Sequence, residues 1–203
     1  MGIRRTVLRV LGALGTNRKP QAAPQQPVRS LEPSPADLMT ACDSIVARLS
    51  SLFTEKGVRA AMDAEEIMAF AMAIVTQTYL LGQGDAAKAT PVLDDFHGDV
   101  ETMMVSRFLQ RGNPALKDDI LNQVVDHFLE LLRVRYPEYK KAFRLDALRG
   151  GHAWFNLSRL ALDRIFADRL TQDQKGTLLC PLALYIAIES VGATALLLPS
   201  KED

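Results

Sequence analysis

The sequence predicts an all-α protein: a single bundle-like domain of six to seven helices behind a basic N-terminal segment and a proline-rich linker. Apolar residues recur at spacings of three and four along most of the chain, which is the period of an α-helix. Neither sustained period-two alternation nor an Asn-Gly or Asp-Gly hairpin turn occurs. Hydrophobic residues make up 48% of the 203 residues and charged residues 24%, as in a globular domain. The expected parts are a basic segment at 1–16, a linker at 17–35, the helical domain at 36–198 and a polar tail at 199–203.

The formal net charge of zero conceals an uneven distribution. Six of the 24 lysines and arginines lie in residues 1–31, which contain no acid because the first acidic residue is Glu32. The rest of the chain contains the other 18 lysines and arginines and all 24 aspartates and glutamates, so its formal charge is −6. Contacts to phosphate dominate the affinity of proteins for nucleic acids. An acidic domain therefore disfavours DNA or RNA as the partner.

The first residues form a short basic amphipathic stretch. Its apolar side chains have helical spacing and its arginines lie mostly on the remaining surface. Such a stretch lies weakly in an anionic membrane interface and is too short to span a bilayer. The residues assigned to this role are Ile3, Arg4, Arg5, Val7, Leu8, Arg9 and Leu11. The alternatives are a twin-arginine export signal, an organellar transit peptide, N-myristoylation at Gly2 and a frayed tail.

Residues 17–35 have the composition of a linker. They contain five prolines and three glutamines and show no apolar periodicity. Proline fixes φ and favours extended, solvated backbone, so this stretch separates the basic segment from the folded domain. We expect a cytoplasmic protein that is peripheral at the membrane, unless residues 1–16 direct export or import into an organelle.

Two helices are predicted in the first half of the domain. Ser34-Pro35 supplies a capping residue and a first-turn proline, and an apolar stripe from Leu38 to Leu52 follows until Gly57. Asp63 and Glu66 form a capping-box pattern before a second, broadly apolar helix. This second helix is expected at the centre of the domain.

Prolines mark the expected starts and ends of the later helices. A third helix opens at Thr90-Pro91, and a fourth opens at Asn113-Pro114 and ends near Pro137. A shorter segment runs from about 138 to 148, and a stripe from Trp154 to Phe166 follows it. The last helix is expected to begin near Pro181. Residues 178–188 are all apolar, but eleven residues are too few to cross a bilayer.

No catalytic residue, cofactor or metal site is predicted. Cys42 and Cys180 are too far apart in sequence to define a zinc spacing, and both are expected to be small buried hydrophobes. Asp94 and His97 lie one helical turn apart, as a carboxylate and an imidazole in a ligand site could. A di-metal bundle needs Glu-x-x-His pairs, and the sequence contains none.

Two further features are candidates for binding. Glu189 lies in an apolar helix, where a carboxylate either pairs with an arginine such as Arg159 or Arg164 or lines a pocket. A run of bases interleaved with Tyr136, Tyr139 and Phe143 is a possible phosphate-facing patch. Its bases are Arg133, Arg135, Lys140, Lys141 and Arg144.

The sequence favours a non-enzymatic helical interaction module. It predicts binding to a protein partner and loose membrane association through the N-terminus. The alternative is a small helical ligand-binding protein or enzyme with an internal cavity near Glu189 or His97.

Overall fold

The computed structural model describes residues 33–111, 118–148 and 154–190, and these form six α-helices and no strand. The all-α prediction is therefore confirmed. The helices are α2 (Pro35–Glu55), α3 (Ala64–Gln83), α4 (Ala86–Arg111), α5 (Asp118–Leu148), α6 (Phe155–Phe166) and α7 (Gln172–Tyr185). Short 3₁₀ turns lie at Arg59–Ala61 and Ala167–Arg169, and a π-type turn at Ile186–Ser190 follows α7. The basic segment at 1–16, the linker up to residue 32 and the tail at 199–203 lie outside the described residues.

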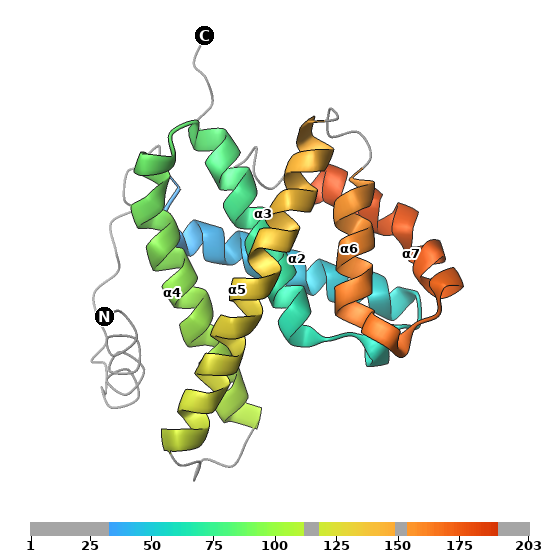
Figure 1. Cartoon of the computed structure of the whole chain (residues 1–203), viewed down its shortest axis with the longest axis horizontal. Coiled ribbons are helices and arrows are strands. Elements are labelled where there is room, and N and C mark those ends of the chain that lie inside the picture. The colour runs from blue at the N-terminus through green and yellow to red at the C-terminus, as the bar shows by residue number, and fades with distance from the viewer. Residues whose placement is uncertain (1–32, 112–117, 149–153, 191–203) are drawn as a thin grey trace, which may run out of the picture.

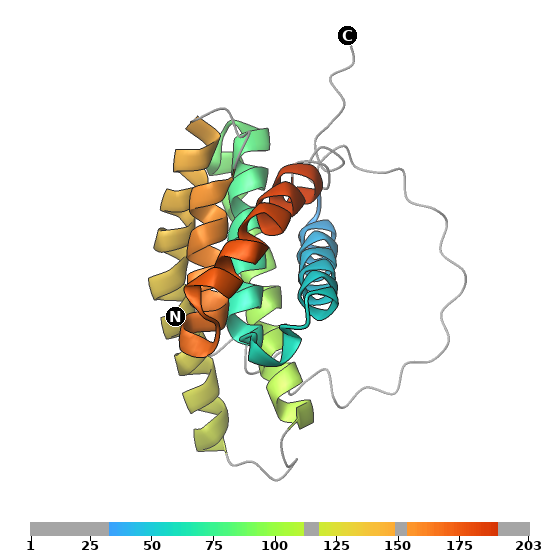
Figure 2. The ribbon, with the colours of Figure 1, turned by 90° about the vertical axis from the view of Figure 1, so that its right-hand side faces the viewer.

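Helix α3 is the central element, as its apolar character predicts. It contacts α2, α4, α5 and α6. Every residue from 66 to 77 is buried, so the helix has no solvent face over three turns. Figure 1 shows α4 and α5 crossing the front of the molecule with α3 behind them, and α6 and α7 beyond α5. Figure 2 shows α5 and α2 on opposite sides of the bundle.

Local sequence signals set several helix ends. The Ser34 hydroxyl accepts from the Asp37 backbone N–H, and the Asp37 carboxylate accepts from the Ser34 N–H, which completes a capping box. Thr171 and Gln174 form the same reciprocal cap at the start of α7. Gly84 ends α3 with a left-handed φ of 66°, a conformation that costs other residues free energy.

Aromatic contacts tie the helices together across the core. The Phe53 ring of α2 meets the Phe166 ring of α6 edge-on, with centroids 4.9 Å apart. Phe143 of α5 lies 4.8 Å from Trp154, the residue that precedes α6. Trp154 adopts a φ of 36° and is buried, so its packing offsets the strain of a left-handed backbone.

Three helix boundaries predicted at prolines are wrong. Pro91 and Pro137 lie inside α4 and α5, and Pro181 lies inside α7, which begins nine residues earlier at Gln172. The segments expected before and after Pro137 are one continuous helix of 31 residues (Figure 1). A proline inside a helix removes one backbone hydrogen bond and costs about 3 kcal/mol. Buried contacts on both sides of Pro137 offset that cost, because Leu132 and Tyr139 are both in the core.

Two side chains differ from their predicted environments. Cys42 is fully buried as expected, whereas Cys180 is exposed on the outer side of α7. The Asp63 side chain caps α3 by accepting from the Glu65 and Glu66 N–H groups. The Glu66 carboxylate, however, points into the interface with α5, where Arg135 and Tyr139 bind it. The predicted capping box is thus only half formed.

Candidate functional site

A partly buried ionic network joins α3, α5 and α6. Glu66 of α3 is 5% exposed, and its Oε1 lies 2.5 Å from Arg135 Nε on α5. The Tyr139 hydroxyl donates to the other Glu66 oxygen at 3.2 Å. Burial, together with the Glu66 charge, raises the pKa of Tyr139 well above its usual value, so this hydroxyl keeps its proton.

The network continues from α5 to α6 through Glu138. Arg135 Nη1 lies 3.5 Å from Glu138 Oε2. The Arg164 guanidinium of α6 donates two hydrogen bonds to the Glu138 carboxylate, at 3.1 and 2.9 Å. Charges therefore alternate in sign from Glu66 to Arg164, and each is compensated by its neighbours. This arrangement is a structural connection, because it leaves no member free to bind a ligand.

A second polar cluster surrounds His97 between α3, α4 and α5. His97 Nε2 lies 3.0 Å from the Thr76 hydroxyl, and the imidazole packs edge-on against the Tyr136 ring at 6.3 Å. Gln77 donates to the Tyr136 hydroxyl at 2.7 Å. Burial lowers the pKa of His97, and the nearby Asp94 carboxylate partly opposes that shift. The four groups satisfy one another in pairs, as buried polar groups in a structural cluster do.

The other candidates near an internal site are placed as follows. Asp94 is exposed on α4, and its effect on His97 is electrostatic. Glu189 lies in the turn at Ile186–Ser190, and its side chain is outside the described residues. Arg164, one of its two predicted partners, is bound to Glu138. The other, Arg159, is exposed.

The predicted basic patch separates into two groups. Arg135 is in the ionic network, and Arg133 forms an exposed pair with Glu130 at 2.7 Å. Tyr139 and Phe143 are buried in the core, so they do not accompany the cations. Lys140, Lys141 and Arg144 are the remaining bases, and no carboxylate among the described residues pairs with them.

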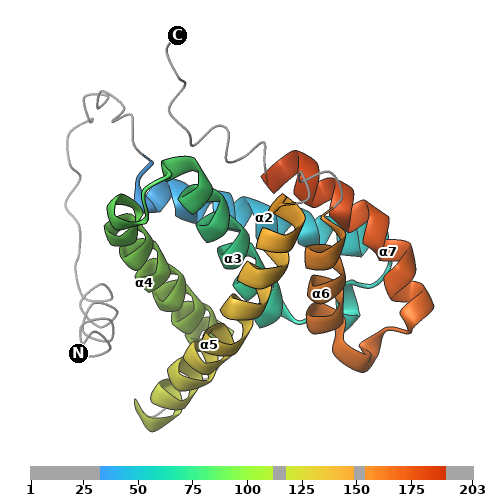
Figure 3. The ribbon, with the colours of Figure 1, turned by 45° about the horizontal axis from the view of Figure 1, so that its top comes forward.

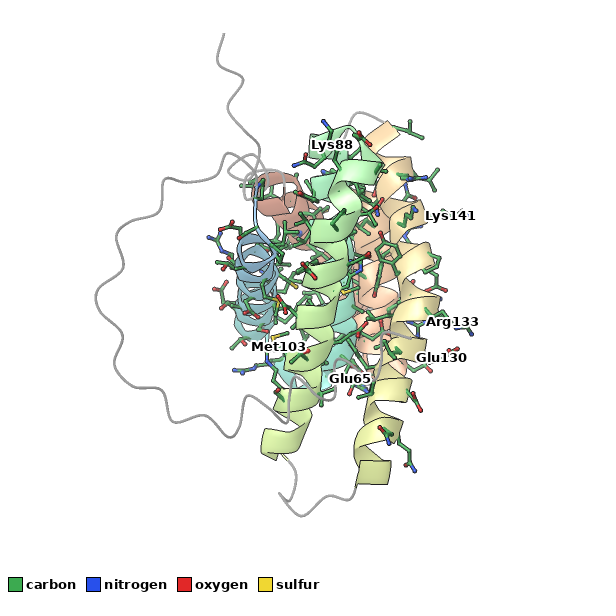
Figure 4. The ribbon with its side chains drawn as sticks, turned by 90° about the vertical axis from the view of Figure 1, so that its left-hand side faces the viewer. Glu65, Lys88, Met103, Glu130, Arg133 and Lys141 are labelled. Atoms are coloured by element: carbon green, nitrogen blue, oxygen red, sulfur yellow. The ribbon has the colours of Figure 1, made fainter. Side chains whose placement is uncertain are left out.

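The outer face of α5 combines these three cations with exposed apolar side chains. Val134 and Leu145 are each 42% exposed, and Leu148 is 85% exposed. A shallow groove of about 320 Å³ lies along this face. Its lining consists of Pro137, Lys140, Lys141, Arg144, Leu145 and Leu148. Figure 4 shows Lys141 and Arg133 extending from the outer side of α5, away from the other helices. We call this surface the α5 face.

Sequence reasoning missed the apolar half of the α5 face. With a helix break at Pro137, residues 134 and 148 belong to different segments and share no surface. On one continuous helix, Val134, Pro137, Lys141, Leu145 and Leu148 recur at spacings of three and four. The signal was therefore present in the sequence and was hidden by the predicted break.

Asp146 is a second residue whose role the sequence did not reveal. It is buried on the inner side of α5, and its carboxylate accepts from the Asn156 side chain and the Leu157 N–H at the start of α6. It therefore caps a different helix from its own, and its carboxylate is occupied by the start of α6.

Among the described helices, none combines the length and the apolar character needed to cross a bilayer. The same part of the chain contains no group of three or more His, Cys, Asp or Glu side chains that could hold a metal ion. Comparisons with known protein families, with curated proteins and with solved structures found no match for this chain.

Proposed function

We propose that this protein is a helical interaction module whose α5 face binds an acidic, amphipathic helix of a partner protein. The observation that carries the proposal lies on one face of α5, whose other face packs in the core. That face combines exposed aliphatic side chains with cations that pair with no carboxylate among residues 33–111, 118–148 and 154–190. Contiguous exposed apolar surface with a charged rim is typical of protein-binding sites.

The dimensions of the α5 face suit a helical partner. Val134 and Leu148 are 14 residues apart, which is about 21 Å along an α-helix. A partner helix of about four turns lying along the groove would place its apolar side chains against Leu145 and Leu148. Glutamates or aspartates beside that stripe would meet Lys140, Lys141 and Arg144, which pair with no carboxylate in the part of the chain that the structure describes.

The chemistry of the α5 face favours a protein over a nucleic acid or a lipid surface. Bases of single-stranded nucleic acids stack on exposed aromatic rings. On α5, Tyr139 and Phe143 are buried and Tyr136 is half-buried against α3. Three of the exposed apolar residues, Pro137, Leu145 and Leu148, line a shallow groove, and a groove along a helix suits the apolar face of a partner helix.

Fluorescence anisotropy with synthetic helical peptides tests this proposal. The probe is an amphipathic peptide with leucines on one face and flanking glutamates, and its counterpart carries lysines in place of the glutamates. We expect the acidic peptide to bind the full chain at about 50 mM salt and to weaken at about 500 mM, because salt screens exposed charges. Equal binding of both peptides would contradict the proposal.

A pair of variants locates the binding. Lys141→Glu combined with Leu148→Ser reverses one charge and removes the most exposed leucine of the α5 face, so the affinity should fall about tenfold or more. The matched control is Lys88→Glu with Leu184→Ser, which makes the same exchanges at exposed positions on α4 and α7 (Figure 4 labels Lys88 and Lys141). Equal loss in both variants, or tighter binding to single-stranded DNA than to the peptide, would contradict a protein partner at the α5 face. So would binding to anionic vesicles that is lost in Lys141→Glu with Leu148→Ser but not in the control variant.

We also propose that residues 1–16 attach the protein loosely to anionic membranes. The basis is the amphipathic pattern of Ile3, Val7 and Leu11 with three arginines, in a segment that contains no acid. The full chain should co-sediment with vesicles containing anionic lipid at low salt, and a variant with Arg4, Arg5 and Arg9 changed to Gln should remain in solution. Identical partitioning of the two proteins would contradict the membrane role.

A further inference from the structure

A cavity of about 300 Å³ lies between α6 and α7, away from the α5 face. Figure 3 shows these two helices side by side at the end of the molecule opposite α4. Both helices supply the lining, which consists of Arg159, Leu162, Asp163, Gln172, Lys175, Gly176 and Leu179. A volume of this size is at the small end of the range seen for ligand pockets.

The charged groups of this cavity include a buried lysine. Lys175 is 8% exposed, although lysine is among the residues least often buried. Its ammonium donates to Asp163 Oδ1 at 3.1 Å, and the Asp163 side chain is 46% exposed. Arg159, which lies on α6 like Asp163, pairs with no carboxylate among the described residues. The lining therefore carries two positive charges and one negative charge.

The remaining lining gives the cavity an apolar side. Leu162 is 2% exposed and Leu179 is half-buried, one from each helix. Gly176 contributes space, because a Cβ atom at that position would meet no heavy atom within 4 Å. Gly176 is exposed at the edge of the cavity, so a larger side chain there would have room to extend over the opening, and most side chains would also favour the helix over glycine.

We propose that the α6–α7 cavity binds a small amphiphilic carboxylate. Arg159 presents a planar, two-pronged donor set that matches a carboxylate, and Lys175 adds a second positive charge beside it. Leu162 and Leu179 contact the apolar part of the ligand. Asp163 neutralises Lys175 when the cavity is empty and limits the affinity for anions when it is filled. The proposal is independent of the α5 face, since no residue lines both sites.

Binding is tested on the full chain with hexanoate as the probe and ¹H–¹⁵N NMR as the readout. Millimolar hexanoate should shift the amide resonances of residues 159–163 and 172–179. Hexan-1-ol should not reproduce the shifts, because it lacks the charge, and inorganic phosphate should bind more weakly, because it lacks the apolar chain. Phosphate binding as tightly as hexanoate, or hexanol shifting the same resonances, would overturn the proposal.

Variants separate this proposal from nonspecific binding. Arg159→Gln should lower the affinity for hexanoate at least tenfold, because charge-assisted hydrogen bonds are lost. Asp163→Asn should raise the affinity for hexanoate several-fold, because it removes the competing carboxylate. Gly176→Leu should abolish binding by filling the cavity and should keep the fold, because leucine favours a helix.

Lys141→Gln on the α5 face is the control and should leave hexanoate binding unchanged. Weaker binding in Asp163→Asn than in the natural chain would overturn the assigned charge roles. Loss of binding in Lys141→Gln would move the site to α5 and overturn the proposal as well.

Discussion

Replacing Glu66 with leucine leaves the Arg135 guanidinium in the interface between α3 and α5 with one carboxylate near it, that of Glu138 at 3.5 Å. Breaking a buried ion pair from one side costs about 3–5 kcal/mol, because the remaining charge stays desolvated. The Arg135 side chain is 22% exposed and retains Glu138, so losing the ion pair alone should cost less, about 2 kcal/mol. The buried Tyr139 hydroxyl also loses its acceptor, which brings the expected cost of Glu66→Leu to about 3 kcal/mol.

Removing the arginine should cost more than removing the glutamate. Arg135→Met leaves the Glu66 side chain, which is 7% exposed, with the Tyr139 hydroxyl as its hydrogen-bond donor. We expect a loss near the upper end of the range, about 4 kcal/mol. The double variant replaces both charges with apolar groups of similar size and leaves the buried Tyr139 hydroxyl without its acceptor. Its free energy of unfolding should lie about 1–2 kcal/mol below that of the natural chain, much less than the sum of the two single losses.

Urea unfolding followed by circular dichroism measures all three free energies, and the double-mutant cycle gives the coupling between the two residues. We expect a coupling energy of several kcal/mol that changes little between low and high salt, because buried pairs are poorly screened. Additive single variants, or a cost below about 0.5 kcal/mol for either one, would show that the pair is not desolvated in solution and would refute this account of the interface.

Three further predictions concern individual residues. Burial lowers the pKa of His97, so this residue takes up a proton at higher pH in the unfolded chain than in the folded one. The free energy of unfolding should therefore fall as the pH drops below about 6.5. In urea unfolding, His97→Gln should make this decline between pH 7 and 5 shallower. In the folded protein, iodoacetamide should modify the exposed Cys180 and spare Cys42. Burial, together with the Asp43 charge, raises the pKa of the Cys42 thiol to about 12, so little reactive thiolate forms there. Equal modification rates would contradict the packing of α2. Pro137→Ala should raise the free energy of unfolding by about 1–3 kcal/mol, because it restores a backbone N–H to α5 at an exposed position. A loss of stability would mean that the proline ring has packing contacts of its own.

Local chemistry predicted the parts of the fold that depend on neighbouring residues. The cap at Ser34 forms because its donor and acceptor groups are three residues apart, a separation that can be read in the sequence. The second helix was correctly expected at the centre because it is broadly apolar. These features need no knowledge of distant segments.

Features that depend on distant partners could not be predicted in this way. Glu66 has the spacing of a capping box, but Arg135 and Tyr139, about 70 residues later, bind its carboxylate instead. Pro137 interrupts the local hydrogen-bond pattern, yet the core contacts of Leu132 and Tyr139 keep α5 continuous. The α5 face depends on that continuity, so the error at Pro137 also concealed the apolar half of the candidate site.

The unbroken burial of residues 66–77 has a consequence for how this protein tolerates change. On an ordinary amphipathic helix, a saturation mutagenesis scan alternates between sensitive and permissive positions about every 3.6 residues. From Glu66 to Gln77 in α3 this periodicity should be absent, because every residue there is buried. Polar substitutions should be rejected at all twelve positions in turn, whereas neighbouring helices should show the usual periodic profile. Residues 66–77, which contribute no surface, would then be the segment of α3 that accepts the fewest substitutions.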